Sequence, residues 1–188
     1  MRRTLSEMTL EELWQLFPIS LTAPDERWKS RYAEMEEKLK AAFSGIPIRR
    51  ISHIGSTAIG TIWAKDIVDI LVEIEPGADM EKAASVAEDV GFLRMSEEEN
   101  RISMNYGYTE NGFSEKVYHL HLRFSGDNDE LYFRDYMTQH PELAKAYESL
   151  KLELWKRFEH DRDGYTNAKT EFIRSATAKA RAAFGNRY

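Results

Sequence analysis

The chain has 188 residues, no cysteine and a net charge of −6, with 26 Lys plus Arg against 32 Asp plus Glu. A composition that is 42% hydrophobic and 31% charged excludes a disordered chain. The absence of cysteine excludes disulfides, a thiolate nucleophile and cysteine-based metal sites. No apolar run approaches the roughly 18 residues that a membrane span needs, so we expect a cytoplasmic protein with no membrane partner.

The negative charge is concentrated in the middle of the chain. Residues 51–128 contain 6 basic and 14 acidic side chains, a net of −8, whereas the segments on either side are each +1. A general nucleic-acid binder is expected to carry a coherent basic patch instead, so nucleic acid is not an expected partner. The acidic centre is either a solvated surface or a cation site, and composition does not choose between them.

Two helices are expected before the sheet. The spacing of apolar residues predicts a short helix over Thr9–Leu16 and a longer one through Leu39, with Thr22 as its cap. Pro24 suits the first turn of the second helix, and Gly45 and Pro47 end it. With no repeats or linker-like stretches, the sequence predicts one domain over residues 1–188. Its parts are N-terminal helices in 1–45, a sheet core in 46–126 and C-terminal helices in 127–188.

The rest of the chain predicts a mixed sheet followed by helices. Asn111-Gly112 is a hairpin signal, and Glu97 to Glu99 is expected to be a solvated loop. The C-terminal helices are separated by Pro141 and Gly164. We therefore predict an α+β fold with a mixed sheet flanked by helices and a helical C-terminal third. The expected strands are Ile48–Ile54, Asp66–Ile74, Phe92–Met95, Arg101–Tyr108 and Lys116–Phe124, and the expected helices are Met80–Val90, Leu131–His140, Pro141–Glu159 and Tyr165–Phe184.

The stretch from His53 to Asp69 is the most informative for chemistry. A strand ends in Gly55-Ser56-Thr57, whose backbone N–H groups and hydroxyls suit phosphate oxygens. Asp69 follows inside an apolar strand, where a carboxylate is costly unless it is paired or meets a metal ion. A phosphate-binding turn beside such a carboxylate is typical of phosphoryl or nucleotidyl transfer. The alternative is a tight turn followed by a core strand with one acid.

These residues resemble the signature of the GrpB family (UPF0157 type), an uncharacterised branch of the nucleotidyltransferase superfamily with a polymerase-β-like palm fold. The resemblance covers about residues 25–180. It implies a nucleotidyltransferase-like fold that binds a nucleoside triphosphate, or another phosphorylated small molecule, with Mg²⁺ or Mn²⁺. The matching positions are His53, Gly55, Ser56, Thr57, Ala64, Lys65 and Asp69, then Tyr118-His-Leu-His-Leu-Arg123, Phe133-Arg-Asp-Tyr136, His140-Pro-Glu142, Tyr147-x-x-x-Lys151 and Tyr165-x-x-x-Lys169.

The sequence also departs from the family pattern. Gly60-Thr61 stands where Pro-Gly is usual, and Asp66 replaces a proline, so the loop between them is expected to be less constrained. Leu71 occupies the position of the superfamily's second carboxylate. Glu73 lies on the same strand face but roughly 13 Å from Asp69, which is too far to share an ion. A two-metal centre is therefore not predicted.

Histidines offer an alternative set of ligands. His119 and His121 project from one strand face, and the superfamily topology is expected to bring His53 and Asp69 near them. In one interpretation the four residues bind a divalent metal, with Zn²⁺ as an alternative to Mg²⁺ or Mn²⁺. In the other, a histidine is a general base or phosphate donor that Asp69 orients. Asp69, His119 and His121 are thus the predicted catalytic residues, unless the histidines only occupy a half-exposed strand face.

Cationic side chains complete the predicted site. Lys151 and Lys169 each follow a tyrosine by four residues, which places each pair on one helix face. The resemblance implies that both lysines, with Lys65 and Arg123, contact phosphates beside the Gly55-Ser56-Thr57 turn. The alternative is lysines on solvated helix faces.

Three functions follow as hypotheses. The first is metal-dependent transfer of a nucleotidyl group to a small acceptor. The second is a non-catalytic module that binds a nucleotide or similar ligand, and the third is a His/Asp metal-dependent hydrolase. The sequence does not determine the oligomeric state or whether the protein is an enzyme.

Overall fold

A five-stranded mixed sheet forms the centre of the molecule. The computed structural model describes residues 4–188, so the first three residues of the predicted 1–45 segment lie outside it. The strand order is β1-β2-β5-β4-β3, in which β2 and β5 are parallel and the other neighbours antiparallel. The predicted α+β fold is confirmed. The strands are β1 (Ile48–Ile54), β2 (Val68–Ile74), β3 (Leu93–Glu98), β4 (Arg101–Thr109) and β5 (Gly112–Phe124).

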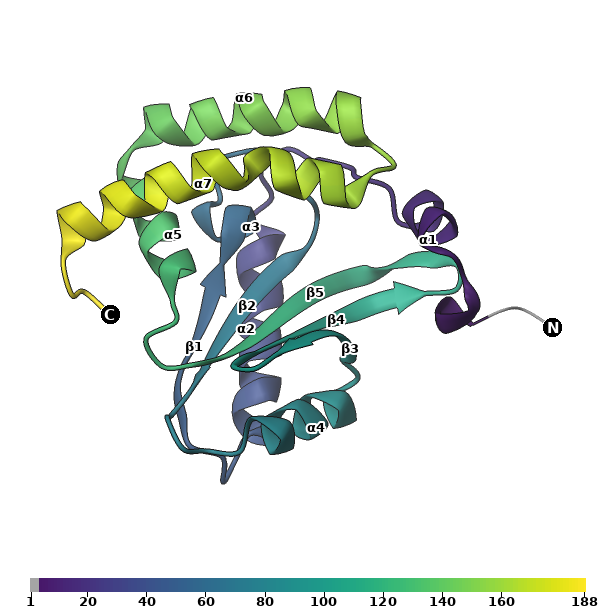
Figure 1. Cartoon of the computed structure of the whole chain (residues 1–188), viewed down its shortest axis with the longest axis vertical. Helices are drawn as coiled ribbons and strands as arrows, with labels where there is room; N and C mark the ends of the chain where they lie inside the picture. The colour runs from purple at the N-terminus through teal and green to yellow at the C-terminus, as the bar shows by residue number, and fades with distance from the viewer. Residues whose placement is uncertain (1–3) are drawn as a thin grey trace.

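Helices cover both faces of the sheet. Figure 1 shows α2 and α4 against one face, and α5, α6 and α7 gathered on the other side beyond the ends of β1 and β2. Within residues 4–188 no helix is both long and apolar enough to cross a membrane. The helices are η1 (Leu5–Glu7), α1 (Leu10–Leu16), α2 (Arg27–Ala42), α3 (Gly55–Ile59), α4 (Met80–Val90), α5 (Asp129–Gln139), α6 (Pro141–Phe158) and α7 (Arg162–Phe184).

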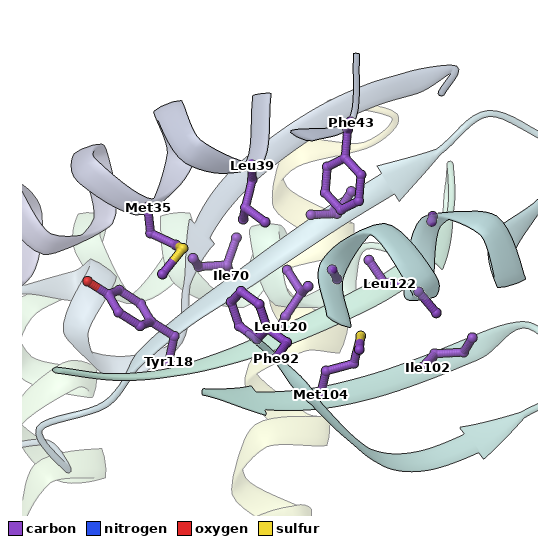
Figure 2. Packing of buried hydrophobic residues seen from close by; sticks show 14 of the residues in the cluster. Met35, Leu39, Phe43, Ile70, Phe92, Ile102, Met104, Tyr118, Leu120 and Leu122 are labelled. Atoms are coloured by element: carbon purple, nitrogen blue, oxygen red, sulfur yellow. The ribbon is translucent and has the colours of Figure 1, made fainter. Parts of the chain in front are cut away.

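The main hydrophobic core lies between the sheet and the α2–α4 pair. Figure 2 shows Met35 and Leu39 of α2, and Phe43 directly after it, on the side of the sheet that carries Ile70 and Leu120 of the two central strands. Both strand residues are fully buried, and burying one such side chain contributes about 1.5–3 kcal/mol. The alternation of apolar residues along β2 and β5 therefore fixes which face these helices cover.

The opposite face of the same two strands carries a polar row. Asp69 of β2 is paired with His119 of β5, and the next positions on this face pair Leu71 with His121 and Glu73 with Arg123. Directly paired residues share a face, so these side chains point toward α3 and the C-terminal helices. The candidate site is built from this row.

Several predicted boundaries are wrong. Thr22 does not cap α2, which begins at Arg27, because Thr22 instead forms an isolated bridge with Ala64. The strand predicted from Asp66 begins at Val68. Glu97 and its neighbour Glu98 are exposed, as expected, but they continue strand β3 and do not form a loop.

Two glycine-containing turns also differ from the prediction. Gly55-Ser56-Thr57 opens the five-residue helix α3. Gly164 does not separate two elements, because α7 begins at Arg162 with Gly164 in its first turn. The Asp161 carboxylate accepts a hydrogen bond from Gly164 N (2.8 Å), and a Cβ at Gly164 would collide with Asp161 and Phe158. Gly164 was expected to break a helix, but it instead lets Asp161 and Phe158 lie against the backbone of the first turn of α7.

Candidate functional site

A cavity of about 680 Å³ lies between the Asp69 end of the sheet and the C-terminal helices, and we call it the cavity under α7. Its volume is within the range of small-molecule sites in proteins. Its three lysines, Asp69 and the Gly55-Ser56-Thr57 segment belong to the predicted site. It is lined by Gly55, Ser56, Thr57, Ala64, Lys65, Ile67, Asp69, Asp129, Glu130, Phe133, Tyr147, Lys151, Tyr165, Thr166, Lys169, Thr170, Ile173, Arg174, Thr177, Ala178 and Arg181.

The Asp69 carboxylate sits directly against the backbone of Gly55. A Cβ on Gly55 would lie 2.6 Å from Asp69 Oδ2, and its φ of +72° also favours glycine. The side chain of Asp69 is 28% exposed. Burial alone would raise its pKa, but hydrogen bonding to His119 and the proximity of His121 hold the pKa well below the usual range. Asp69 is therefore an ionised carboxylate beside the α3 start.

A chain of hydrogen bonds connects Asp69 to the start of α7. Arg162 Nη2 lies 3.0 Å from Tyr108 Oη, Tyr108 Oη lies 2.9 Å from His119 Nε2, and His119 Nδ1 lies 3.0 Å from Asp69 Oδ1. The guanidinium can only donate, and burial lowers the pKa of His119, which keeps the ring neutral. The directions are thus fixed: Tyr108 donates to Nε2, and Nδ1–H donates to Asp69. Both nitrogens of His119 are occupied.

Tyr108 and Arg162 were not predicted from the sequence. The register of β4 against β5 shifts between Tyr106 and Tyr108, with the extra residues on β5 between Phe113 and Tyr118, and Gly107 between the two tyrosines has a φ of +86°. Tyr106 packs with Tyr118 on the core face, whereas Tyr108 reaches His119 on the polar face. Strict alternation would have placed both tyrosines on the core face. The available signal was a glycine inside an alternating strand.

His53 does not join the other predicted ligands. Ile54, not His53, is paired with Asp69, so His53 lies on the face toward α2, where its ring stacks on Tyr32 at 4.8 Å between centroids. Its Nε2 lies 2.9 Å from Thr57 Oγ1, and burial lowers the pKa of His53 to about 4. His53 thus anchors α3.

The remaining histidine stays near the carboxylate without bonding to it. His121 Nε2 lies 3.8 Å from Asp69 Oδ1, and its buried Nδ1 has no hydrogen-bond partner. Within residues 4–188 no group of three or more His, Asp or Glu side chains is arranged to hold a metal ion. A metal centre made from protein ligands alone therefore does not fit this site.

Three lysines converge on the Asp69 end of the cavity from different elements. Lys65 precedes β2, while Lys151 and Lys169 come from α6 and α7. Lys151 Nζ donates to Ser56 Oγ (2.9 Å) and lies 4.9 Å from the Tyr147 ring centroid. Lys169 Nζ lies 4.2 Å from the Tyr165 ring centroid. Each tyrosine and its lysine thus form a cation–π pair on one helix face.

These lysines are held in an unfavourable electrostatic environment. Burial lowers the pKa of Lys151 and of Lys169 to about 7, and repulsion by Lys65 adds to both shifts. Burial and the charge of Arg162 lower the pKa of Lys65 to about 8, although Asp69 opposes the shift. Asp69 is the negative charge that all three lysines share, and Glu148 adds a second beside Lys151, so an incoming polyanion would relieve the repulsion among the lysines.

The loop after α3 is tied to α6. Glu148 accepts a hydrogen bond from Trp63 N (2.7 Å), and Lys151 donates to the carbonyl oxygen of Trp63. Ile62 is completely buried in the same loop. This is the loop in which Gly60-Thr61 and Asp66 replace the prolines of the family pattern. Side chains of α6 therefore hold a loop whose backbone the prolines would otherwise restrict.

Other conspicuous charged residues have structural partners. Arg123 does not line the cavity, since it pairs with Glu130 (2.8 Å) and Asp127 (3.4 Å). Glu73 is buried and pairs with Arg50. Asp66 accepts hydrogen bonds from Trp28 Nε1 and Arg31 Nη1, both at 2.8 Å, and so anchors α2 beside the start of β2.

The fold and the cavity define an α+β protein with a lysine-rich cavity at one end of a mixed sheet. Residues 18–179 match the model of the GrpB family, described as "GrpB protein". The chain therefore belongs to the GrpB family, as the sequence motifs predicted.

Similar proteins and a solved structure agree with this assignment. The chain is 32% identical over 161 residues to the glutamate-rich protein GrpB of Alkalihalophilus pseudofirmus, covering 82% of this chain and 91% of that protein. It is 35% identical over 158 residues to a UPF0157 protein of Deinococcus radiodurans, covering 82% and 79%. The crystal structure of the conserved protein GrpB from Enterococcus faecalis superposes with a TM-score of 0.75 at 25% identity, covering 88% of this chain and 99% of that one.

Proposed function

We propose that the cavity under α7 binds a nucleoside triphosphate and that the protein transfers its nucleotidyl group to a small acceptor. The observation that carries the proposal is the convergence of Lys65, Lys151 and Lys169 on Asp69. A triphosphate carries enough negative charge to match these groups, and its base and ribose suit the aromatic and apolar residues farther along the cavity.

Each cationic group has a distinct part in holding phosphate. Lys151 is already oriented by Ser56 and Trp63, so it meets a phosphate with little loss of side-chain freedom. Lys169 is positioned by Tyr165, and Lys65 stands beside Asp69. Binding raises the pKa values of these lysines, because the phosphate charge favours their protonated forms. The complex therefore takes up protons between about pH 7 and pH 8.

The contribution of a metal ion rests on Asp69. Mg²⁺ in phosphate sites commonly uses one or two carboxylates and completes its coordination with phosphate oxygens and water. Asp69 supplies one such carboxylate, and Leu71 stands at the second position. When bound, the ion would neutralise phosphate charge. The chain's own part is to hold the ionised Asp69 in place through His119 and Gly55.

Isothermal titration calorimetry with ATP, GTP, CTP and UTP in MgCl₂ tests the binding, and tripolyphosphate serves as a probe without a base. We expect Lys169→Met to weaken binding by about tenfold or more. Lys179→Met is the matched control, because it removes an exposed lysine of the same helix outside the cavity. If no nucleotide and no tripolyphosphate binds to the folded protein, the proposal fails.

A non-catalytic binding module is the second candidate, favoured by Leu71 at the position of the second carboxylate. Pyrophosphate release from a bound nucleotide separates the two. An enzyme loses this release with Asp69→Asn or with EDTA and keeps it with Asp89→Asn, an exposed control on α4. A module shows no release, and its nucleotide affinity barely changes with EDTA. No specific observation favours the His/Asp hydrolase.

A further inference from the structure

A second cavity lies at the opposite end of α7 from the C-terminus, beside the N-terminal helices. It has a volume of about 780 Å³ and shares no lining residue with the cavity under α7. Figure 1 shows α1 beside the tip of the β4–β5 hairpin, and residues of both line the cavity. We call it the N-terminal groove. It is lined by Thr4, Leu5, Ser6, Leu10, Leu13, Trp14, Phe17, Leu93, Arg94, Met95, Asn105, Tyr108, Thr109, Glu110 and Arg162.

The walls of the N-terminal groove are apolar and exposed. Leu10 of α1 is 52% exposed, and Leu93 and Met95 of β3 are 48% and 56% exposed. Among residues 4–188 the remaining large exposed hydrophobic residue is Phe113, whose ring is tilted against that of Phe17 at the groove's margin, with 5.0 Å between centroids. Helix α1 contains no buried residue. Exposed apolar side chains thus gather at one place, which is typical of a surface that binds another molecule.

A half-buried guanidinium in this groove lacks a counterion. Arg162 donates to Phe17 O (3.1 Å) and Tyr108 Oη (3.0 Å), which uses two of its five N–H groups. It forms no ion pair with a carboxylate of residues 4–188. The other arginine of the groove, Arg94, differs, because it pairs with Glu81, Glu88 and Glu97. Arg162 is therefore a guanidinium without an ion pair beside apolar walls, in a groove that Glu110 also lines.

We propose that the N-terminal groove binds an amphipathic carboxylate, a small molecule with an apolar chain and one carboxylate group. The chain lies between Leu10, Leu93 and Met95, and the carboxylate pairs with the free N–H groups of Arg162. A planar guanidinium binds a carboxylate through two parallel hydrogen bonds. One guanidinium matches one carboxylate charge, whereas the several charges of a triphosphate match the lysines of the other cavity. The proposal does not depend on nucleotide binding.

Titration calorimetry with octanoate tests the proposal, with 1-octanol and acetate as probes for the chain and the head alone. We expect octanoate to bind with one site per chain. The alcohol lacks the charge and acetate lacks the apolar chain, so each is expected to bind at least about tenfold more weakly. No octanoate binding by a folded sample, or equal affinity for 1-octanol, would overturn the proposal.

Two variants locate the binding. Leu93→Asn with Met95→Asn changes only exposed side chains, and it is expected to weaken octanoate binding about tenfold while the melting temperature stays near that of the parent protein. Arg162→Gln has the same expected effect, whereas Arg157→Gln, an exposed arginine of α6 outside the groove, leaves binding unchanged. Unchanged affinity in the Leu93/Met95 variant contradicts the proposal.

The alternative to a small molecule in the N-terminal groove is a second copy of the chain, paired through the edge strand β3. Light scattering on the parent protein and on the Leu93/Met95 variant tests this alternative. A monomer in both supports the proposal. A dimer that dissociates in the variant, and that octanoate leaves intact, overturns it in favour of self-association. Parallel titration with tripolyphosphate keeps a failure here distinct from a failure of nucleotide binding.

Discussion

The two faces of the β2–β5 strand pair are built on different principles. On the α2–α4 face, Ile70 and Leu120 are completely buried among other hydrophobic side chains, and no polar partner is needed. On the other face, Asp69 and His119 occupy the neighbouring positions of the same strands and are joined by a hydrogen bond. The first face is held by shape and volume, and the second by specific pairs between charged or polar groups. A substitution should therefore affect stability on the first face and binding on the second.

The largest expected difference between the faces is in folding stability. Leu120→Ala removes a fully buried side chain and is expected to lower the free energy of unfolding by about 2–5 kcal/mol. His121→Ala, one residue away on the other face, is half-buried and should cost less than about 1 kcal/mol. Urea unfolding of both variants provides the measurement. Equal losses would show that the polar face also carries the fold.

The next effect is the pH dependence of polyphosphate binding. Free Lys151 and Lys169 have a pKa of about 7 and free Lys65 of about 8, so raising the pH from 7 to 9 neutralises them. Phosphate favours their protonated forms, and the affinity for tripolyphosphate should therefore fall by at least about tenfold over this interval. Calorimetry at pH 8 in buffers of different ionisation enthalpy should report net proton uptake. Constant affinity across this range would show that the lysines do not contact the phosphates.

A smaller effect is expected on stability when a site lysine is replaced. Burial and neighbouring positive charges disfavour protonated Lys169 in the free protein, so Lys169→Met should raise the free energy of unfolding by about 1 kcal/mol at pH 7. Thermal melting without ligand, compared with Lys179→Met, measures the change. A stabilised variant with weakened tripolyphosphate binding would identify a residue kept for binding. A strongly destabilised variant would instead assign Lys169 to the fold.

The smallest effect concerns the connection to α7. Tyr108→Phe removes the hydroxyl between Arg162 and His119 and leaves His119 Nε2 without its donor, at a cost of about 1 kcal/mol. Tyr106→Phe is the matched control on the same strand, since no hydrogen bond is recorded for its hydroxyl within residues 4–188. Urea unfolding compares the two variants. A similar cost for both would mean that the Tyr108 hydroxyl adds nothing.

Much of the fold could be predicted because it depends on repeated local patterns. The alternation in β2 and β5 and the helical spacing of α2, α4 and α6 each follow from many residues that agree. The GrpB motifs added the fold family and pointed to the lysines of α6 and α7, which the structure places in the cavity. Their roles in binding and the expected metal ion stay predictions.

The errors arose where one residue decides the outcome. The prediction grouped His53 with Asp69, but the register of β1 pairs Ile54 with Asp69, and a shift by one position reverses the face. Gly164 was expected to interrupt a helix, and the contact between its backbone and Asp161 instead begins one. Neither the pairing of strands nor the packing around a glycine can be obtained from a local pattern.

The backbone of Gly107 links the hydrogen-bond chain to a single residue that takes no part in it. Tyr106 and Tyr108 would share a face on a regular strand, and the φ of +86° at Gly107 lets them lie on opposite faces. A side chain at this position would be strained, because a Cβ would also lie 2.3 Å from Lys116 O. Arg162 and His119 are therefore joined through a tyrosine whose direction depends on a conformation that glycine adopts readily and other residues do not.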